Sequence, residues 1–477
     1  MFTTNYQKVL FVLVALSVVL RFFSFFPSVM DHDESTYLVI ANEMLHHKTL
    51  YTDLIDIKPP GIFLLYALQL WLVKSVFFTR FITALVVAAT AYCLYIAKRQ
   101  QTPNNSQSAF ATGVIYVFLC STFTFYGVSP NTELYFNAFT ALALVLFNKQ
   151  RLMYYFFGGL MMGIGFIIKY MVLLDFTAFM LWAFVAMLLA GVSLPKAIGQ
   201  MFVRASLAFV GLLLPLAACH LYYYLTNNFD AYYFITYIAP KRYANTWQPL
   251  HMAQLIGDYY LRFLPISFFF FYTLFQSKSP KNERLFALIW TLLSLMAVTL
   301  PSNRFGHYTI QLMLPTAYLA GSFFAADAVR PKWANVVLQK NIGYPLLALI
   351  IGIIVYLQKH DCYDKPDIPQ QTANYLNAHL QPTETLYTGN TQHIVYLLTN
   401  QRSPIAYVHR NLIFDKKHIR SIAIDTTAQI NRLIALQPTY ILQQDTLPNK
   451  RLQQFVQQQY TLVQTIGNKV QIFRRMD

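Results

Sequence analysis

Long apolar runs constrain this chain more than any other feature of its sequence. Each run approaches the roughly 20 predominantly apolar residues that a helix needs to cross a bilayer. Of the 477 residues, 56% are apolar and 12% are charged, against about 45–50% and about 25% in ordinary soluble domains. This composition excludes a soluble enzyme. We predict a polytopic α-helical membrane protein with about eleven spans, at 9–27, 79–97, 109–127, 133–148, 153–169, 171–190, 205–225, 263–276, 285–301, 308–326 and 342–358.

Two apolar segments require a choice about the membrane. The first run follows Lys8, as in a secretory signal, but it continues through Phe22 and Phe26 without a small-residue cleavage site. We therefore predict a retained first span. The run at 61–73 is about thirteen residues long, which is short for a span and typical of an interfacial or re-entrant segment. We predict that it does not cross and that it belongs to a first outer loop, 28–78.

The charge distribution supports this topology. The net charge is +16, from 36 Lys and Arg against 20 Asp and Glu, but the charges form short clusters between apolar runs instead of one basic face. This pattern indicates membrane topology and speaks against nucleic-acid binding. With 61–73 not crossing, six positive clusters lie on one side, as the positive-inside rule requires: Lys8, Lys98-Arg99, Lys149 with Arg151, Lys196 with Arg204, Lys278 with Lys281 and Arg284, and Arg330 with Lys332 and Lys340.

The composition changes from about residue 360 onward to Gln, Asn, Thr and charged residues. Short strands predicted at 439–442 and 459–463 alternate there with helices. We predict a transmembrane module at 1–358 and a small soluble α/β domain at 359–477 on the extracytoplasmic side of the inner (plasma) membrane. The four cysteines lie far apart and show neither a disulfide framework nor a metal-binding spacing: Cys93, Cys120, Cys219 and Cys362.

Carboxylates and cations gather on the predicted outer side, although the positive-inside rule depletes that side of cations. Asp33 and Glu34 begin a predicted helix, Lys58 precedes two prolines that stop any helix, and Glu133 begins a span. The other cations on this side are Lys169, Lys241, Arg242 and Arg304. Together they indicate a site that binds an anionic lipid head group and transfers protons. A phosphate attached to a long isoprenoid fits this description.

Each of these residues also has a simpler interpretation. Acidic side chains at a helix N-terminus interact favourably with the helix macrodipole and stabilise the helix by about 0.3–1 kcal/mol each. This explains Asp33 and Glu34 as well as a catalytic role does. A lysine at a membrane boundary is usually a snorkelling anchor, and for Lys169 both interpretations stay open. In the functional interpretation, Asp33 is a general base, Lys58 binds a lipid-borne phosphate, and Glu133 is paired or solvated in a cavity.

These residues resemble the polyprenyl-phosphate-dependent glycosyltransferases of the GT-C type. The resemblance rests on three motifs, and it covers 9 to about 330. It is strongest to the bacterial relatives of protein O-mannosyltransferases and of undecaprenyl-phosphate aminoarabinose transferase. The motifs are Asp33-Glu34 with Tyr37, Leu50-Tyr51-Thr52-Asp53 followed by Lys58-Pro59-Pro60, and Arg304-Phe305-Gly306-His307-Tyr308 running on to Pro315.

The resemblance implies the GT-C fold, juxtamembrane helices in the first outer loop, and roles for particular residues. It assigns Asp33, Glu34 and Glu133 to catalysis, and it assigns Tyr37, Lys58, Lys169, Arg242, Arg304 and His307 to substrate binding. The aminoarabinose transferase type has a Glu before the Lys-Pro and a His in the long outer loop as metal ligands. This chain has Ile57 instead, and no His between Asn227 and His251. We therefore expect no metal ligands there and no cofactor, with a divalent metal left as an open alternative.

The chemistry implied is displacement at the anomeric carbon of a sugar in the cell envelope. Asp33 takes a proton from an acceptor hydroxyl, and polyprenyl phosphate leaves, its charge stabilised by the cations. The expected partners are a polyprenyl-phosphate sugar, the lipid bilayer, and an acceptor lipid, protein or glycan. One rival is a transporter or flippase of an anionic or lipid-linked substrate, although the chain has no internal repeat. Another is a polymerase or ligase of lipid-linked oligosaccharides.

Overall fold

The computed structural model describes residues 5–122, 126–276 and 280–476. The chain divides into two compact units, and each unit is assembled from three separate stretches of sequence. Unit 1 comprises Met1–Phe25, Arg80–Cys219 and Asn245–Asp361, and unit 2 comprises Phe26–Thr79, His220–Ala244 and Cys362–Asp477. The predicted boundary at residue 358 stays a prediction. Lys278, a member of one predicted positive cluster, lies outside the described residues.

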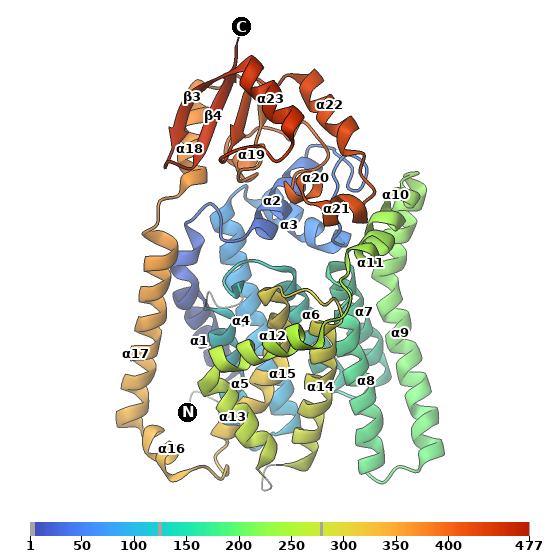
Figure 1. The fold of residues 1–477 in the computed structure, drawn as a ribbon. Helices are drawn as coiled ribbons and strands as arrows, with labels where there is room; N and C mark the ends of the chain where they lie inside the picture. Colours follow the sequence, from blue (N-terminus) through green and yellow to red (C-terminus); the bar gives the residue numbers. More distant parts are fainter. Residues whose placement is uncertain (1–4, 123–125, 277–279, 477) are drawn as a thin grey trace. The chain divides into compact units, whose positions relative to one another are not determined.

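All the regular secondary structure in the described residues of unit 1 is helical, and every predicted apolar window contains a helix (Figure 1). The long window at 308–326 is broken, because a short α-helix lies there between two 3-10 segments. The helices are α1 (Tyr6–Arg21), α4 (Val76–Gln101), α5 (Ser106–Cys120), α6 (Thr132–Phe147), α7 (Leu152–Ile168), α8 (Val172–Leu189), α9 (Leu194–Leu225), α12 (Pro249–Arg262), α13 (Leu264–Phe275), α14 (Lys281–Thr299), α15 (Met313–Ala320), α16 (Lys332–Val337) and α17 (Lys340–Gln358), with 3-10 segments η1 (Phe22–Phe25), η4 (Gly306–Leu312) and η5 (Gly321–Phe324).

Five helical segments in the described ranges are long and apolar enough to cross a membrane. They are Tyr6–Phe25, Val76–Gln101, Val172–Leu189, Leu194–Leu225 and the beginning of Lys340–His379. Five further apolar helices are shorter, and one of them, Pro60–Leu72, covers all but the last residue of the segment at 61–73 that we predict not to cross. The protein is therefore a membrane protein with several apolar helices, while the number of eleven spans stays a prediction.

Small residues bring α7 and α9 into close backbone contact. A Cβ atom added at Gly159 of α7 would lie 1.8 Å from the carbonyl oxygen of Ala208, and one added at Gly163 would lie 2.3 Å from that of Leu212. Gly211 of α9 meets the carbonyl of Phe156 in the same way. Because attraction between apolar surfaces is weak within lipid, such close packing is a main source of helix association there.

Unit 2 contains two helices of the first predicted outer loop, α2 (His32–Met44) and α3 (Pro60–Leu72). Tyr37 of α2 packs edge-on against Phe63 and Tyr66 of α3, with ring centroids 5.7 and 5.4 Å away. The opposite side of α3 leaves Leu64, Leu68 and Trp71 exposed. An apolar stripe with this helical spacing suits a helix that lies in a membrane interface.

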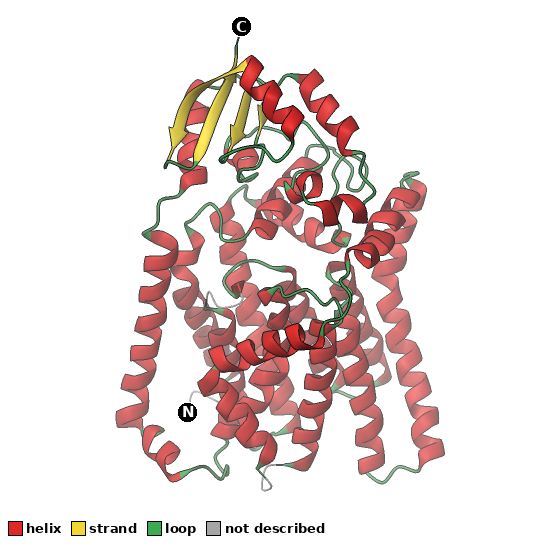
Figure 2. Cartoon of the chain, viewed as in Figure 1, coloured by secondary structure: helices red, strands yellow, loops and turns green. Residues whose placement is uncertain are grey.

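The rest of unit 2 combines short helices with a four-stranded sheet (Figure 2). The strand order is β1-β2-β4-β3, with β1 parallel to β2 and the other pairs antiparallel. The strands predicted at 439–442 and 459–463 are confirmed as β2 and β3. The elements are α10 (Phe229–Tyr233), the π-helix η3 (Phe234–Ile238), α11 (Ala239–Tyr243), the π-helix η6 (Lys359–Tyr363, at the edge of both units), α18 (Ile368–His379), β1 (Leu386–Tyr387), α19 (Val395–Leu398), α20 (Asn411–Phe414), α21 (Lys416–Ser421), α22 (Thr426–Leu436), β2 (Tyr440–Gln443), α23 (Lys450–Gln459), β3 (Tyr460–Ile466) and β4 (Val470–Arg475).

The sheet and two amphipathic helices enclose the apolar core of the C-terminal part. Ile430 and Leu433 of α22 and Leu452 and Val456 of α23 pack there with Ile441 of β2. The β3–β4 hairpin turns through Gly467 and Asn468, whose φ angles are +55° and +52°. Gly and Asn tolerate this left-handed conformation better than other residues.

Candidate functional site

An ion pair between Asp33 and Lys58 lies at the start of α2. Asp31 caps this helix by accepting a hydrogen bond from the backbone N–H of Asp33 at 3.3 Å, which places Asp33 in the first turn. The Nζ atom of Lys58 lies 2.9 Å from Oδ2 of Asp33. The two side chains are 21% and 26% exposed. A substrate could therefore reach both charges without unfolding of the unit.

Tyr37 completes this group from the next turn of α2. Its hydroxyl donates to Oδ2 of Asp33 at 3.3 Å, and its ring centroid lies 5.4 Å from Nζ of Lys58. The ring itself is buried. The spacing of four residues between Asp33 and Tyr37 puts both side chains on one helix face. The structure thus brings together three residues that the sequence analysis selected.

The backbone holds Lys58 in place. Its N–H donates to Oδ1 of Asp56 at 2.9 Å, and its carbonyl accepts from the hydroxyl of Tyr51 at 2.8 Å. Pro59 is the N-cap of α3 and has an extended conformation. Asp56 is only 6% exposed, and this burial raises the pKa of its carboxyl against the opposing effect of the Lys58 ammonium. The sequence alone gave no reason to select Asp56.

The C-terminal part of the chain is hydrogen-bonded to the first loop within unit 2. The N–H of Ile55 donates to the carbonyl of Ala406 at 2.9 Å. The N–H of Ser28 donates to Asp367, the N-cap of α18, at 2.6 Å. The ammonium of Lys48 donates to the carbonyl of Ser403 at 3.1 Å. These bonds tie the loop that carries Asp33 to residues more than 300 positions later in the sequence.

Two more of the predicted site residues belong to unit 2. Glu34 is fully buried in the first turn of α2, so it is less accessible to a substrate than Asp33. Arg242 lies on α11 with an exposed side chain, and its guanidinium is 5.1 Å from the ring centroid of Phe234. The next residue, Tyr243, packs against His418 with a centroid distance of 4.6 Å. Burial raises the pKa of Tyr243, and the nearby charge of Lys58 opposes this.

The remaining predicted site residues belong to unit 1. Glu133, in the first turn of α6, forms an ion pair with Lys169 and accepts from the hydroxyl of Thr132 at 2.8 Å. The Nζ atom of Lys169 lies 3.9 Å from the ring centroid of Tyr308. Lys169 is therefore paired inside the unit, and its side chain is 13% exposed. This pairing explains how a carboxylate is accommodated at the start of an apolar helix.

The motif from Arg304 to Tyr308 divides into a buried and an exposed part. His307 is 9% exposed and stacks almost parallel on Phe305, with centroids 5.7 Å apart. Arg304 is exposed. Of the nine predicted site residues, five belong to unit 2 and four belong to unit 1. That both groups face a common substrate stays a prediction.

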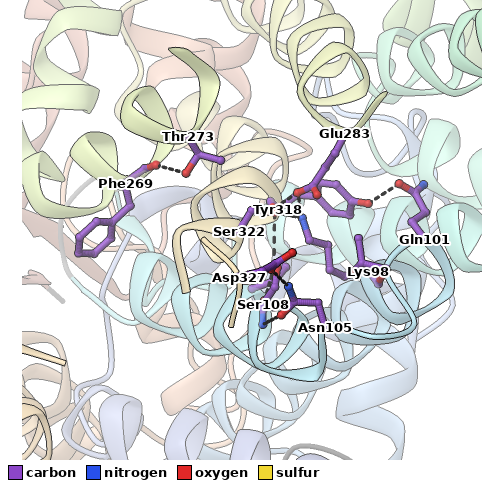
Figure 3. A network of polar contacts seen from close by, with 12 residues as sticks. Lys98, Gln101, Asn105, Ser108, Phe269, Thr273, Glu283, Tyr318, Ser322 and Asp327 are labelled. Atoms are coloured by element: carbon purple, nitrogen blue, oxygen red, sulfur yellow. Dashed lines mark hydrogen bonds and ion pairs between the residues drawn. The ribbon is translucent and has the colours of Figure 1, made fainter. Parts of the chain in front are cut away.

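A second buried ion pair in unit 1 belongs to the scaffold. Lys98 of α4 pairs with Glu283 of α14 and donates to the carbonyl of Tyr318 at 3.0 Å and to the hydroxyl of Ser322 at 2.5 Å (Figure 3). The Lys98 side chain is fully buried. In the sequence, Lys98 belongs to a positive cluster, and its partner could not be predicted because α4 and α14 are distant in sequence.

Three histidines near Asp33 were not selected from the sequence. They are His32, directly before Asp33, and His393 and His409 from the C-terminal part. The only sequence signal was the position of His32 directly before Asp33 and Glu34. Among the described residues, no group of three or more His, Cys, Asp or Glu side chains is arranged to hold a metal ion.

The apolar helices and the small sheet belong to a polytopic membrane protein, and comparison with solved structures gives its fold class as GT-C. The same fold is present in ArnT from Cupriavidus metallidurans. The structure of ArnT bound to undecaprenyl phosphate matches with a TM-score of 0.66 and 13% identity, over 98% of this chain and 97% of that chain. The apo structure matches with a TM-score of 0.67 and 14% identity, over 97% of both chains.

These matches confirm the predicted fold class, including its helical membrane character and the small C-terminal sheet. At this level of identity the likeness concerns the fold. No protein-family model matches the chain, and no curated protein does so either.

Proposed function

We propose that this protein is a membrane glycosyltransferase that moves a sugar from a polyprenyl-phosphate donor to an acceptor hydroxyl or phosphate on the extracytoplasmic face. The observation that carries the proposal is the Asp33–Lys58 pair, with Nζ and Oδ2 2.9 Å apart and both side chains partly exposed. The pair stands in a fold shared with ArnT, one structure of which is bound to undecaprenyl phosphate. A base and a phosphate-binding cation side by side are what this reaction requires.

The ion pair implies that the donor binds before Asp33 accepts a proton from the acceptor. The phosphodiester of the donor carries one negative charge and offers two non-bridging oxygens as acceptors, so it competes with Asp33 for the ammonium of Lys58. When Lys58 turns to the phosphate, Asp33 loses its cationic partner and becomes a better proton acceptor. Binding of the donor thus prepares the base for the acceptor. Tyr37 keeps the carboxylate oriented through its hydroxyl.

The transfer itself is a displacement. The acceptor oxygen forms a bond to the anomeric carbon, its proton goes to Asp33, and the bond between that carbon and the phosphate oxygen breaks with its electron pair leaving on the phosphate. Lys58 stabilises the charge of the departing polyprenyl phosphate. In this proposal Arg242 binds the donor phosphate and Glu34 supports Asp33. The catalytic role of Glu133 and the substrate-binding roles of Lys169, Arg304 and His307 stay predictions from the sequence.

The first prediction tests this function with two single variants. Membranes that contain wild-type protein, Asp33→Asn or Lys58→Ala are given a panel of radiolabelled polyprenyl-phosphate sugars, and transfer to endogenous acceptors is measured. We expect Asp33→Asn to lower transfer about 10²-fold to 10⁴-fold, because it removes the base. We expect Lys58→Ala to lower it about 10²-fold.

The control is Lys8→Ala, a lysine at the start of α1 in unit 1, outside the proposed site. Wild-type activity in Asp33→Asn would exclude Asp33 as the base. Movement of the labelled lipid across the membrane without transfer of its sugar would instead identify a flippase.

A further inference from the structure

The Leu50-Tyr51-Thr52-Asp53 motif, to which the proposed function gives no role, forms a tight turn between α2 and α3. The carboxylate of Asp53 accepts from the N–H of Thr49 at 2.8 Å, and the N–H of Tyr51 donates to the carbonyl of Leu54 at 2.7 Å. Tyr51 has a φ angle of +74°. A residue with a bulky side chain rarely adopts this left-handed conformation, which persists only where the surrounding structure imposes it. The contacts of the Tyr51 side chain must therefore account for the turn.

The ring of Tyr51 packs against two other tyrosines of unit 2, Tyr223 in the last turn of α9 and Tyr232 in α10. Its centroid lies 5.5 Å from that of Tyr223 and 5.7 Å from that of Tyr232. Tyr223 and Tyr232 stack almost parallel on each other, with centroids 4.3 Å apart. All three side chains are buried. Such ring pairs stabilise packing beyond the area that they bury, so this tyrosine cluster (Tyr51, Tyr223 and Tyr232) holds the strained turn.

At one end, the tyrosine cluster fixes the backbone of Lys58. The hydroxyl of Tyr51 donates to the carbonyl of Lys58 at 2.8 Å. Pro59 and Pro60 follow Lys58, and their restricted φ angles limit the backbone on the other side. The Lys58 side chain is partly exposed, but it extends from a backbone position that the cluster defines.

At the other end, the tyrosine cluster is joined to the segment that carries Arg242. The carbonyl of Tyr232 accepts from the hydroxyl of Thr236 at 2.6 Å, and Thr236 belongs to the π-helix η3. This π-helix leads directly into α11. The guanidinium of Arg242 on α11 lies 5.1 Å from the ring centroid of Phe234 in η3. Short π-helical segments are frequent at functional sites.

We propose that Tyr51 and Tyr232 are positioning residues for the donor phosphate, because the tyrosine cluster sets the position of Lys58 relative to Arg242. This inference rests on the proposed glycosyltransferase function, which assigns both cations to that phosphate. Lysine and arginine side chains are long and flexible, so a site that uses two of them gains affinity when their backbones are in place before the ligand binds. A set of buried rings between the two backbones provides this without touching the substrate.

The test measures the Kd of a fluorescent polyprenyl phosphate for the full-length protein in detergent, which requires neither acceptor nor turnover. Tyr51→Phe keeps the ring and removes only the hydroxyl that is bonded to the Lys58 carbonyl. Tyr232→Leu removes the ring that joins Tyr51 to η3. Each change is made in the wild-type protein, in Lys58→Ala and in Arg242→Ala.

We expect Tyr51→Phe to raise the Kd about 3-fold to 10-fold, because one neutral hydrogen bond no longer fixes Lys58. In Lys58→Ala the same change should alter the Kd by less than about 2-fold, because a residue that acts through Lys58 then has nothing to position. In Arg242→Ala it should keep its full effect. Tyr232→Leu should raise the Kd about 10-fold in wild type and about 3-fold in either alanine variant, where one cation is still displaced.

Tyr460→Phe is the matched control. The buried hydroxyl of Tyr460 donates to the carbonyl of Pro438 at 2.7 Å, so this variant loses a similar hydrogen bond outside the tyrosine cluster and should keep the wild-type Kd. Tyr223→Leu removes the other half of the stacked pair and should follow the pattern of Tyr232→Leu, which keeps the test independent of the folding of one variant. Thermal unfolding midpoints are measured for every variant.

A purely structural role would lower these midpoints and would change the Kd by the same factor in all three backgrounds. That result would overturn the proposal, and so would a wild-type Kd in Tyr51→Phe. Either result leaves the glycosyltransferase function intact, because the wild-type protein still binds the probe and transfers sugar. Wild-type protein that neither binds polyprenyl phosphate nor transfers sugar from it would overturn the proposed function, and the role of the tyrosine cluster with it.

Discussion

Asp33 and Lys58 are 25 residues apart and form an ion pair because one begins a helix and the other stands before the prolines that begin the next helix. Each position is fixed locally. Asp31 caps α2, and Asp56 and Tyr51 hold the backbone of Lys58. At the residue scale, the site therefore depends on a few short-range hydrogen bonds that fix the backbone positions of Asp33 and Lys58.

Tyr37 provides a second prediction at this scale. Tyr37→Phe removes one donor to Asp33 and keeps the buried ring, so we expect sugar transfer to fall about 2-fold to 10-fold. The effect should be smaller than that of Lys58→Ala, because the 3.3 Å hydrogen bond is long and its donor is neutral. Transfer assays with Tyr66→Phe as a control measure this, since Tyr66 packs on the same ring from α3. A loss as large as that of Asp33→Asn would mean that the Tyr37 hydroxyl takes part in the reaction.

At the element scale, polar pairs tie together helices that are far apart in sequence. The Lys98–Glu283 pair joins α4 to α14, and Ser322 of η5 also donates to Glu283. In another case, Asp175 of α8 accepts from the indole N–H of Trp290 on α14 at 2.8 Å. Such polar groups cost free energy when they are buried without partners. They therefore favour the packing of those helices that carry matching partners.

The third prediction concerns the Lys98–Glu283 ion pair. Lys98→Met leaves the Glu283 carboxylate buried without its cation, so we expect a loss of about 3–5 kcal/mol in stability. The double variant Lys98→Met with Glu283→Leu should regain most of the loss, because neither charge is then buried. Thermal unfolding midpoints in one detergent compare the variants. Similar midpoints for the single variant and wild type would show that the pair contributes nothing to stability.

At the scale of the whole molecule, unit 2 brings His32 of the first loop together with His393 and His409 of the C-terminal part. These histidines make the free energy of unfolding depend on pH. Burial lowers the pKa values of His32 and His393 from 6.5, and that of His409 to about 3. These histidines stay neutral in the folded protein, whereas the unfolded chain takes up protons below about pH 6.5. Their stabilisation is therefore present above pH 6.5 and is lost as the pH falls toward the folded pKa values. Asp56, whose pKa is raised, acts in the opposite direction.

We expect the unfolding midpoint to fall between pH 7 and pH 5, with each histidine contributing at most about 1.4 kcal/mol per pH unit. Thermal unfolding of the full chain across this range measures the slope. His393→Gln removes one titrating group and should make the slope shallower, even where it lowers the midpoint itself. An unchanged slope in His393→Gln would contradict the assignment of acid sensitivity to this cluster.

The sequence predicted much of the fold because membrane insertion acts on local composition. Every apolar window contains a helix, and the two predicted strands are β2 and β3. The window at 308–326 was predicted as one span, but it contains η4, α15 and η5. Hydropathy registers apolar content over such a stretch and is insensitive to a change from α to 3-10 hydrogen bonding.

The sequence by itself determined the membrane class, the helix start at Asp33 and Glu34, and the candidate residues Asp33 and Lys58, since each depends on residues close together in the chain. Only the tertiary structure decided which cations have partners and that His393 and His409 stand beside His32. The physical reason is that an ion pair or an imidazole cluster depends on distance in space. Composition and periodicity carry no information about which of many distant segments will supply the other half of such a contact.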